Sequence, residues 1–187
     1  MALIEDALEY AASHHEGQMR KMTGLPYILH PLEAAVTAST MTTDEEVIAA
    51  ALLHDTVEDT DATLDDIRER FGERVAFLVG TETEDKMWDL PREQSWKLRK
   101  SLSLKTLKES PDPGTKVIWI SDKLSNIRGF YREWKKRGIE FFDMFNMKDP
   151  KEQEWYYRTI LNYTEDMKNE DAWMELKKLV DDIFEGI

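Results

Sequence analysis

The sequence contains no cysteine, which limits both its covalent structure and its metal chemistry. Disulfide bonds and thiolate metal sites are excluded, so any bound metal must be held by histidine, aspartate or glutamate. The absence of cysteine also agrees with a cytoplasmic location, which we expect for this protein.

Long apolar segments are absent as well. No run approaches the roughly 20 apolar residues that a membrane-spanning helix needs, and the first six residues do not resemble a signal peptide. The chain has 187 residues, of which 41% are hydrophobic, and it shows no internal repeat. This length and composition fit one folded domain with a real core.

Positive charge is scarce: 25 lysines and arginines face 38 acidic residues, which gives a net charge of −13. A chain this acidic is poorly suited to nucleic acid or to an anionic membrane surface, so we expect neither as a partner. The exception is the strip 91–108, which has six basic residues and one acidic residue. Lys97 and Lys100 in this strip are candidate phosphate contacts, and a solvated helix face is the alternative interpretation.

The spacing of apolar residues predicts an all-α fold, a bundle of helices. Near the N-terminus Ile4, Leu8 and His15 recur on one helical face, so we expect His15 to point inward. Another helix is predicted to begin at Pro31, because proline suits a first helical position. We interpret His30, just before it, as a residue that holds the preceding loop.

The stretch from His54 to Asp59 follows a run of seven apolar residues and concentrates polar groups at the end of a helix. Residues 43–46 resemble a capping box at the start of that helix. Adjacent His54 and Asp55 can both bind one divalent metal. If the helix continues, Glu58 and Asp59 lie one turn further on. The alternative is a helix that simply ends in a polar, solvated turn.

Residues 117–120 would suit a strand on their own, but the apolar pattern continues through Leu124 and Ile127 at helical spacing. Asp122 and Asn126 lie one turn apart on the adjoining face. They are either a buried ligand with its neighbour or an exposed polar pair.

The candidate ligands are two imidazoles and two carboxylates: His15, His54, Asp55 and Asp122. A divalent metal without thiolates takes such nitrogen and oxygen ligands and keeps open positions for water. The same order of residues occurs in the HD phosphohydrolase superfamily, and spaced motifs resemble those of its RelA/SpoT-type hydrolase domains. The matching segments are His15-Glu-Gly-Gln18, Arg20-Lys21, Thr23-Gly24, Pro26-Tyr27-Ile28, His30-Pro31, residues 50–60, Phe71-Gly72 and Asp122-Lys-Leu-Ser-Asn126-Ile-Arg128.

This resemblance covers residues 3–130 and implies an HD-domain helical bundle with one bound metal, usually manganese. Residues 1–187 would form a single HD-type hydrolase domain, with 131–187 as a helical C-terminal extension packed on the core. The resemblance implies that the four candidate ligands bind the metal. It also places Glu58 and Asp59 at the positions of the catalytic acids, and Asn126 beside the substrate. The implied reaction removes the 3′-pyrophosphate from guanosine tetra- or pentaphosphate.

The chemistry is compatible with this resemblance, because a metal lowers the pKa of bound water towards about 7 and a carboxylate such as Glu58 can move its proton. Arg20, Lys21 and Arg128 are candidate contacts for the anionic substrate. Arg20 and Lys21 could equally fix the loop that carries them.

Other functions remain open. Ser121, Gly129 and the segments 96–108 and after 131 depart from the usual pattern, so the substrate could be another phosphorylated nucleotide, such as NADPH or a nucleoside monophosphate. A metal-dependent nucleotide sensor without turnover is a second alternative, but it would not need the proton-transfer group Glu58. A di-iron oxidative member would need further histidine ligands. The sequence predicts no oligomeric state.

Overall fold

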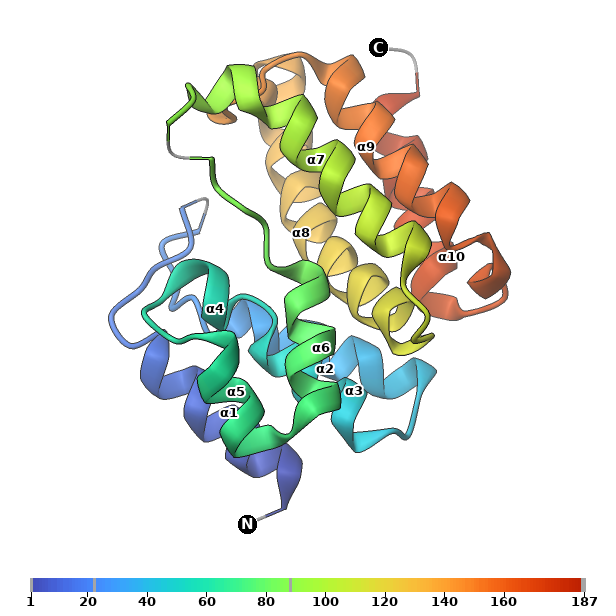
Figure 1. Cartoon of the computed structure of the whole chain (residues 1–187). Coiled ribbons are helices and arrows are strands. Elements are labelled where there is room, and N and C mark those ends of the chain that lie inside the picture. Colours follow the sequence, from blue (N-terminus) through green and yellow to red (C-terminus); the bar gives the residue numbers. More distant parts are fainter. Residues whose placement is uncertain (1, 22, 88, 186–187) are drawn as a thin grey trace.

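The computed structural model describes residues 2–21, 23–87 and 89–185, and these residues form helices and no extended strand. The all-α prediction is therefore confirmed (Figure 1). The helices are α1 (Leu3–His14), α2 (Leu29–Met41), α3 (Glu45–Leu53), α4 (Thr56–Asp59), α5 (Leu64–Phe71), α6 (Glu73–Glu82), α7 (Arg92–Glu109), α8 (Gly114–Arg137), η1 (Gly138–Met144), α9 (Pro150–Tyr163), η2 (Glu165–Met167) and α10 (Asp171–Phe184).

Helix α3 lies at the centre of the first apolar cluster, to which α1, α2, α5 and α6 also contribute. Every residue from Val47 to Leu53 is buried, and the helix packs against α1, α2, α6 and α8. A helix that is apolar on all sides must lie in the interior, because no face of it favours water. The residue that follows this helix, His54, is consequently buried too, with 1% of its surface exposed.

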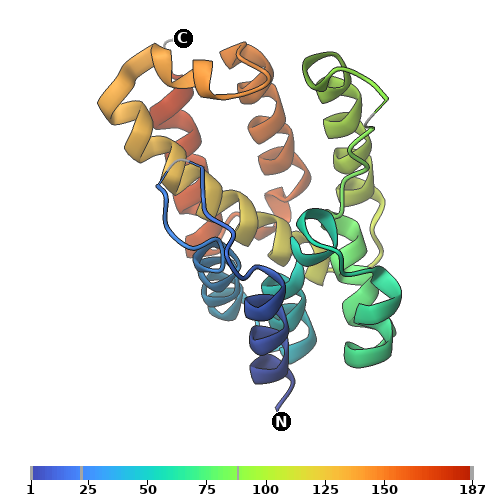
Figure 2. The ribbon, with the colours of Figure 1, turned by 90° about the vertical axis from the view of Figure 1, so that its left-hand side faces the viewer.

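Helix α8 joins the two halves of the molecule, extending from the lower group of helices to the upper one in Figures 1 and 2. Its first turns contribute Val117 and Ile118 to the first cluster. The following turns belong to a second cluster with α7, η1, α9 and α10, where Trp119 and Leu124 are buried. Asp122 therefore lies between the two clusters. The description of 131–187 as an extension of one domain stays a prediction.

The capping box expected at residues 43–46 is not formed. The N-cap of α3 is Asp44, whose carboxylate accepts a hydrogen bond from the backbone N–H of Glu46 at 3.1 Å, so no capping box forms from Thr43. A capping box forms instead at the start of α5, between Thr63 and Asp66. In both cases a short polar side chain satisfies a backbone donor that the first turn leaves unpaired.

Among the helices that the structure describes, none combines the length and the apolar character that crossing a membrane would require.

Candidate metal centre

Four side chains from three parts of the chain converge where α2, α8 and the junction of α3 and α4 meet. Nε2 of His30 lies 3.2 Å from Oδ2 of Asp55 and 3.0 Å from Oδ1 of Asp122. Nε2 of His54 lies 3.2 Å and 3.5 Å from the same two oxygens. The two Nε2 atoms are 3.2 Å apart. Two nitrogens and two oxygens thus face one small volume, as the ligands of one cation would.

The hydrogen bonds behind the two imidazoles fix their tautomers. Nδ1 of His54 lies 2.8 Å from the backbone oxygen of Ala51, which can only accept, so this nitrogen carries the proton. Nδ1 of His30 lies 2.8 Å from the hydroxyl of Ser125, which donates its own proton to Glu33 at 2.7 Å. His30 must then also donate from Nδ1. Both imidazoles therefore turn an Nε2 lone pair towards the centre, which is the orientation that second partners impose on metal-binding histidines.

The electrostatics of the cluster also favour a cation. Burial opposes charge on the imidazole, but the carboxylates of Asp55 and Asp122 outweigh it and raise the pKa of His54 above its usual range. Burial likewise opposes charge on Asp55, yet the two histidines hold the pKa of its carboxyl well below the ordinary value. The donor set fits a divalent metal, since two imidazoles and two carboxylates suit such ions and need no cysteine.

His15 is not part of this cluster, which corrects the ligand set expected from the sequence. Among the described residues, the group whose ligand atoms all lie within 4.8 Å of one another is His30, His54 and Asp122. His15 is buried as predicted, but its Nδ1 donates to the side-chain oxygen of Gln18 at 2.9 Å. It lies at the C-terminal end of α1, where its ring packs 4.9 Å from that of Tyr27.

His30 occupies the position that we had expected for His15, and a signal in the sequence could have identified it. Helix α2 begins at Leu29 and not at Pro31, so His30 is part of the helix. It then starts a buried face with Ala34 and Ala38 at spacings of four residues. The proline at the third position of the helix hid this pattern.

Glu58 and Asp59 lie beside the cluster on the short helix α4, which follows α3 after a turn at residues 54–55. Lys86 forms ion pairs with both carboxylates, and the backbone N–H of Glu84 donates to Glu58 at 2.9 Å. Burial is the main cause that raises the pKa of Glu58, and the charge of Asp55 adds to it, while Lys86 opposes the rise. A partly buried carboxylate with a raised pKa next to a candidate metal centre is suited to proton transfer.

Two adjoining cavities lie at and beside the cluster. The first, here called the inner cavity, has a volume of about 170 Å³ and is lined by His30, Asp55, Glu58 and Asp122 among others. The second, the outer cavity, has a volume of about 650 Å³. The two share three lining residues, Tyr27, Asp59 and Asn126. The outer cavity therefore adjoins the one that contains the candidate metal centre.

A model of the HD domain matches residues 7–140 of this sequence. The chain belongs to the HD domain family. The guanosine-3′,5′-bis(diphosphate) 3′-pyrophosphohydrolase of Aquifex aeolicus is 41% identical over 138 residues, which are 73% of this chain and 19% of that protein. The human guanosine-3′,5′-bis(diphosphate) 3′-pyrophosphohydrolase MESH1 is 42% identical over 150 residues, 76% of this chain and 80% of the human protein.

The same family relationship appears in three dimensions. A solved metazoan orthologue of SpoT, described as hydrolysing ppGpp, superimposes on this HD domain with a TM-score of 0.71 and 29% identity. The match covers 99% of this chain and 95% of that one. This HD domain thus spans only about a fifth of the Aquifex relative, but nearly the whole length of the small metazoan protein.

Three of the candidate substrate contacts lie at the outer cavity of the HD domain. Arg20, Lys21 and Asn126 line it. Arg20 donates to the side-chain oxygen of Asn126 at 3.1 Å, and Asn126 donates to Asp122 at 2.7 Å. Asn126 therefore connects the candidate metal centre with a basic residue, and its place beside the substrate stays a prediction.

Arg128 and Lys97 lie elsewhere, which argues against the substrate role that we expected for them. Arg128 is held by Glu33 at 3.0 Å and Glu175 at 2.6 Å, and it lines neither of the two cavities. Lys97 pairs with Glu152 and lies over the ring of Trp155. Both side chains form ion pairs with carboxylates of other helices. Sequence spacing alone does not reveal such partners.

Lys100 is the member of the basic strip that reaches the inner cavity, where it pairs with Glu84 at 2.9 Å. Helix α7 therefore turns one part of the strip towards the site and another part, at Lys97, towards α9.

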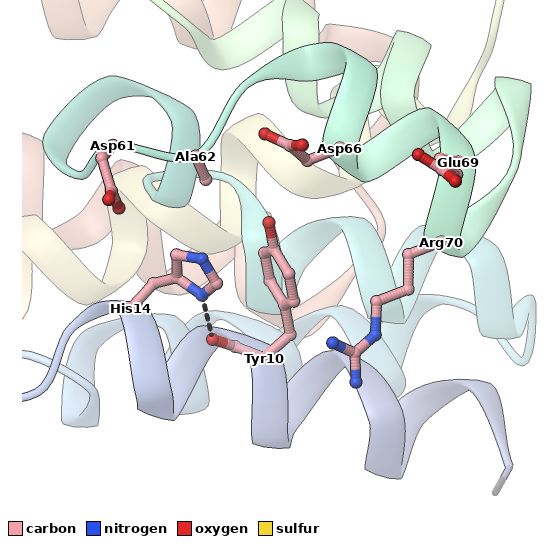
Figure 3. A pocket seen from close by; sticks show the side chains of 7 residues that line it. All are labelled: Tyr10, His14, Asp61, Ala62, Asp66, Glu69 and Arg70. Atoms are coloured by element: carbon pink, nitrogen blue, oxygen red, sulfur yellow. Dashed lines mark hydrogen bonds between the residues drawn. The ribbon is translucent and has the colours of Figure 1, made fainter.

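Figure 3 shows a different cavity, of about 540 Å³, between α1 and α5. His14 lines it together with Tyr10 and Asp61, and its Nδ1 donates to the backbone oxygen of Tyr10 at 2.8 Å. None of the residues that form the candidate metal centre lines this cavity. His14 therefore points away from the centre, although it is the neighbour of His15.

Proposed function

We propose that this HD domain is a metal-dependent hydrolase that removes the 3′-pyrophosphate from guanosine 3′,5′-bis(diphosphate). The observation that carries this proposal is the convergence of two Nε2 atoms and two carboxylate oxygens beside the partly buried carboxylate of Glu58. The named activity of the Aquifex and human relatives supports the choice of substrate.

The proposed ligands are His30, His54, Asp55 and Asp122, and the proposed ion is Mn²⁺. When bound, the ion would supply a Lewis acid for the phosphoryl oxygens and make water easier to ionise. Within the chain, Ser125 and the backbone of Ala51 hold the imidazoles in the required tautomer. Tyr27 holds Asp55 in place by donating its hydroxyl proton to Oδ2 at 2.6 Å.

Glu58 is proposed to orient the attacking water and to accept its proton. The water oxygen forms a bond to the phosphorus next to the 3′ oxygen, the bond between that phosphorus and the 3′ oxygen breaks, and the 3′ oxygen takes up a proton. The products are pyrophosphate and guanosine 5′-diphosphate. Burial keeps the proton affinity of Glu58 high enough for this exchange, and Lys86 limits the rise of its pKa.

The nucleoside part of the substrate is proposed to occupy the outer cavity. Arg20 and Lys21 give this cavity positive charge, and Met144 and Phe145 give it apolar surface. A guanine ring needs such surface for stacking, and its 5′-diphosphate needs cations. A cytoplasmic location and a nucleotide as the small-molecule partner belong to the same proposal.

The test is to incubate the Mn²⁺-loaded protein with a panel of guanosine tetraphosphate, NADPH and nucleoside monophosphates, and to identify the products. We expect pyrophosphate from guanosine tetraphosphate. Glu58→Gln should retain metal and nucleotide binding and lose turnover by about 10²-fold or more, because it removes the proton acceptor without changing its shape. If phosphate is released only from NADPH or from a monophosphate, that nucleotide is the substrate and guanosine tetraphosphate is not. Binding of a nucleotide without any turnover would favour a sensor.

A further inference from the structure

Besides the candidate metal ligands, side chains from α7, α8 and α9 line the inner cavity, and we call this part of its wall the far end. We define this far end by Lys100, Ser103, Trp119 and Tyr156, all of which line the cavity. Lys100 and Ser103 are one turn apart on α7, and Tyr156 comes from the segment after the recognised motifs. The proposed reaction centre uses none of these four side chains. Lys100 and Ser103 contact Glu84 at 2.9 Å and 3.5 Å, so the indole N–H of Trp119 is the polar group that still needs an explanation.

Trp119 carries the observation that points to a ligand. Its side chain is 1% exposed, and within the described part of the chain its Nε1 has no hydrogen-bond partner. An indole N–H can only donate, and buried donors are nearly always paired. An acceptor inside the inner cavity would supply the missing partner.

The charges around Trp119 favour an anion as that acceptor. Nζ of Lys123 lies 4.7 Å from the centre of the Trp119 ring. Lys100 pairs with Glu84, but Arg99 pairs with the same carboxylate, so Glu84 stays neutralised if Lys100 turns to a ligand. Lys123 is itself paired with Asp122 and with Glu82 at 3.3 Å, so it adds positive charge beside the indole without being free of partners. The ammonium group of Lys100, the indole N–H of Trp119 and the hydroxyl of Ser103 can therefore face one anionic group.

A second buried side-chain atom on the wall of the inner cavity also lacks a partner among the described residues. This atom, Oε1 of Glu82, is an acceptor. A water molecule could donate to Glu82 and accept from Trp119. A phosphate group that retains one proton could make the same two contacts, because it offers one donor and several acceptors. These two occupants predict different effects of removing the indole N–H.

We propose that the far end of the inner cavity binds the terminal phosphate of a 3′-diphosphate. The phosphate that is cleaved from the 3′ oxygen would lie at the metal centre, between this terminal phosphate and the nucleoside in the outer cavity. The proposal rests on the proposed function and makes it more specific, because it explains why the domain would act on a diphosphate and not on a monophosphate. Trp119, Lys100 and Lys123 are the residues that make this distinction.

The test compares two tryptophan-to-phenylalanine variants. Trp119→Phe keeps the ring and removes the unpaired N–H. Trp173→Phe is the matched control, because the N–H of Trp173 is satisfied by Thr164 at 3.0 Å and lies outside both cavities. The Mn²⁺-loaded proteins are titrated calorimetrically with pyrophosphate and, separately, with phosphate at equal free Mn²⁺.

We expect Trp119→Phe to raise the Kd of pyrophosphate by about 10-fold or more, because it removes a hydrogen bond to a charged group. Its Kd for phosphate should change much less, and its thermal stability should not fall, because the lost donor had no partner. Trp173→Phe should show the reverse: a lower melting temperature and an unchanged Kd for pyrophosphate.

An unchanged Kd for pyrophosphate in Trp119→Phe would overturn the proposal and assign the far end to water. If that variant does not fold, Lys100→Met takes its place. We expect it to raise the Kd of pyrophosphate by about 10-fold or more, and an unchanged Kd would overturn the proposal. Pyrophosphate binding does not depend on turnover of guanosine tetraphosphate. The subsite can therefore be confirmed when the proposed reaction is not, and refuted when the reaction is confirmed.

Discussion

Gln18 donates its side-chain amide to the backbone oxygen of Asp59 at 2.9 Å. The oxygen of the same amide accepts from Nδ1 of His15, also at 2.9 Å. The ring of His15 lies 4.9 Å from that of Tyr27, whose hydroxyl donates to both Asp55 and Asp59. His15 thus acts on the candidate metal centre through other residues, and we interpret it as a positioning residue for α4.

The first prediction separates this role from that of a ligand. His15→Ala should lower kcat by about 10-fold, because α4 loses a support, while the affinity for Mn²⁺ stays close to that of the unchanged protein. His14→Ala is the control, since His14 faces the cavity of Figure 3, and it should change neither quantity. The measurements are steady-state kinetics and calorimetric titration with Mn²⁺. A loss of affinity above about 100-fold in His15→Ala would restore the ligand set expected from the sequence.

The second prediction concerns the histidine that the structure places in the cluster. His30→Ala should lower the affinity for Mn²⁺ by more than about 100-fold, because it removes one of four converging donors. Removing a residue that only hydrogen-bonds to a metal ligand typically lowers metal affinity by about 10–100-fold. Ser125→Ala should cost about 10-fold, since His30 then loses the partner that fixes its tautomer. Calorimetric titration with Mn²⁺ ranks the variants. Equal affinities in His30→Ala and Ser125→Ala would contradict the proposed ligand.

Periodicity was sufficient to predict the helices that bury large apolar faces, because burial of these faces is what stabilises them. Helix α3 is an example, since seven consecutive apolar residues leave no other position than the interior. Periodicity also predicted that His15 is buried, whereas it left His54 and Asp122 open between a buried and a solvated position, and the structure buries both. Periodicity failed at the start of α2, where Leu29 and His30 form the first turn ahead of a proline that usually marks one. Because the helix begins two residues before Pro31, His30 belongs to its first turn and lies on its buried face.

Ion pairs between distant helices were beyond the reach of the sequence. Arg128 and Lys97 resemble free cations along the chain, but carboxylates from α2, α9 and α10 neutralise them. Such partners depend on how the helices pack and not on local spacing. Composition therefore identified a basic strip without showing that Lys100 is the member that lines the inner cavity.

The third prediction uses the pKa of Glu58. Burial and the charge of Asp55 raise this pKa, and Lys86 opposes them. Glu58 must be ionised to accept a proton, so activity falls as the pH drops through its pKa. Lys86→Met removes the opposing charge and should move the acid limb of kcat/KM towards higher pH.

The control for this shift is Lys97→Met, which also removes one positive charge but at a lysine that pairs with Glu152 and lines neither cavity. It should leave the acid limb in place. The profiles are recorded at a saturating and constant free Mn²⁺ concentration. An acid limb that moves to lower pH in Lys86→Met would argue against Glu58 as the proton acceptor.

The fourth prediction concerns stability and involves Arg74, which ties together the N-terminal ends of three helices. From the start of α6 it donates to Asp44 at 2.7 Å, to Glu46 at 2.9 Å and to Asp112 at 2.8 Å. The hydrogen bonds of Arg74 are the main cause that lowers the pKa of Asp112. Arg74→Met should therefore reduce the free energy of unfolding by about 1 kcal/mol at pH 7, a value discounted for solvent screening because Arg74 is 34% exposed.

The pH dependence of this loss follows from the direction of the shift. A carboxyl whose pKa is lowered by folding stabilises the protein above its unfolded pKa, and this contribution disappears as the pH falls through the folded value. The difference between Arg74→Met and the unchanged protein should thus be complete at pH 7 and shrink below about pH 4. Arg68→Met is the matched control, because its partners Asp65 and Glu73 are 90% and 82% exposed, and it should lower the free energy of unfolding less than Arg74→Met does. Urea unfolding of the metal-free proteins at pH 7 and pH 3 measures both effects, and a difference for Arg74→Met that persists at pH 3 would show that packing and not charge is the cause.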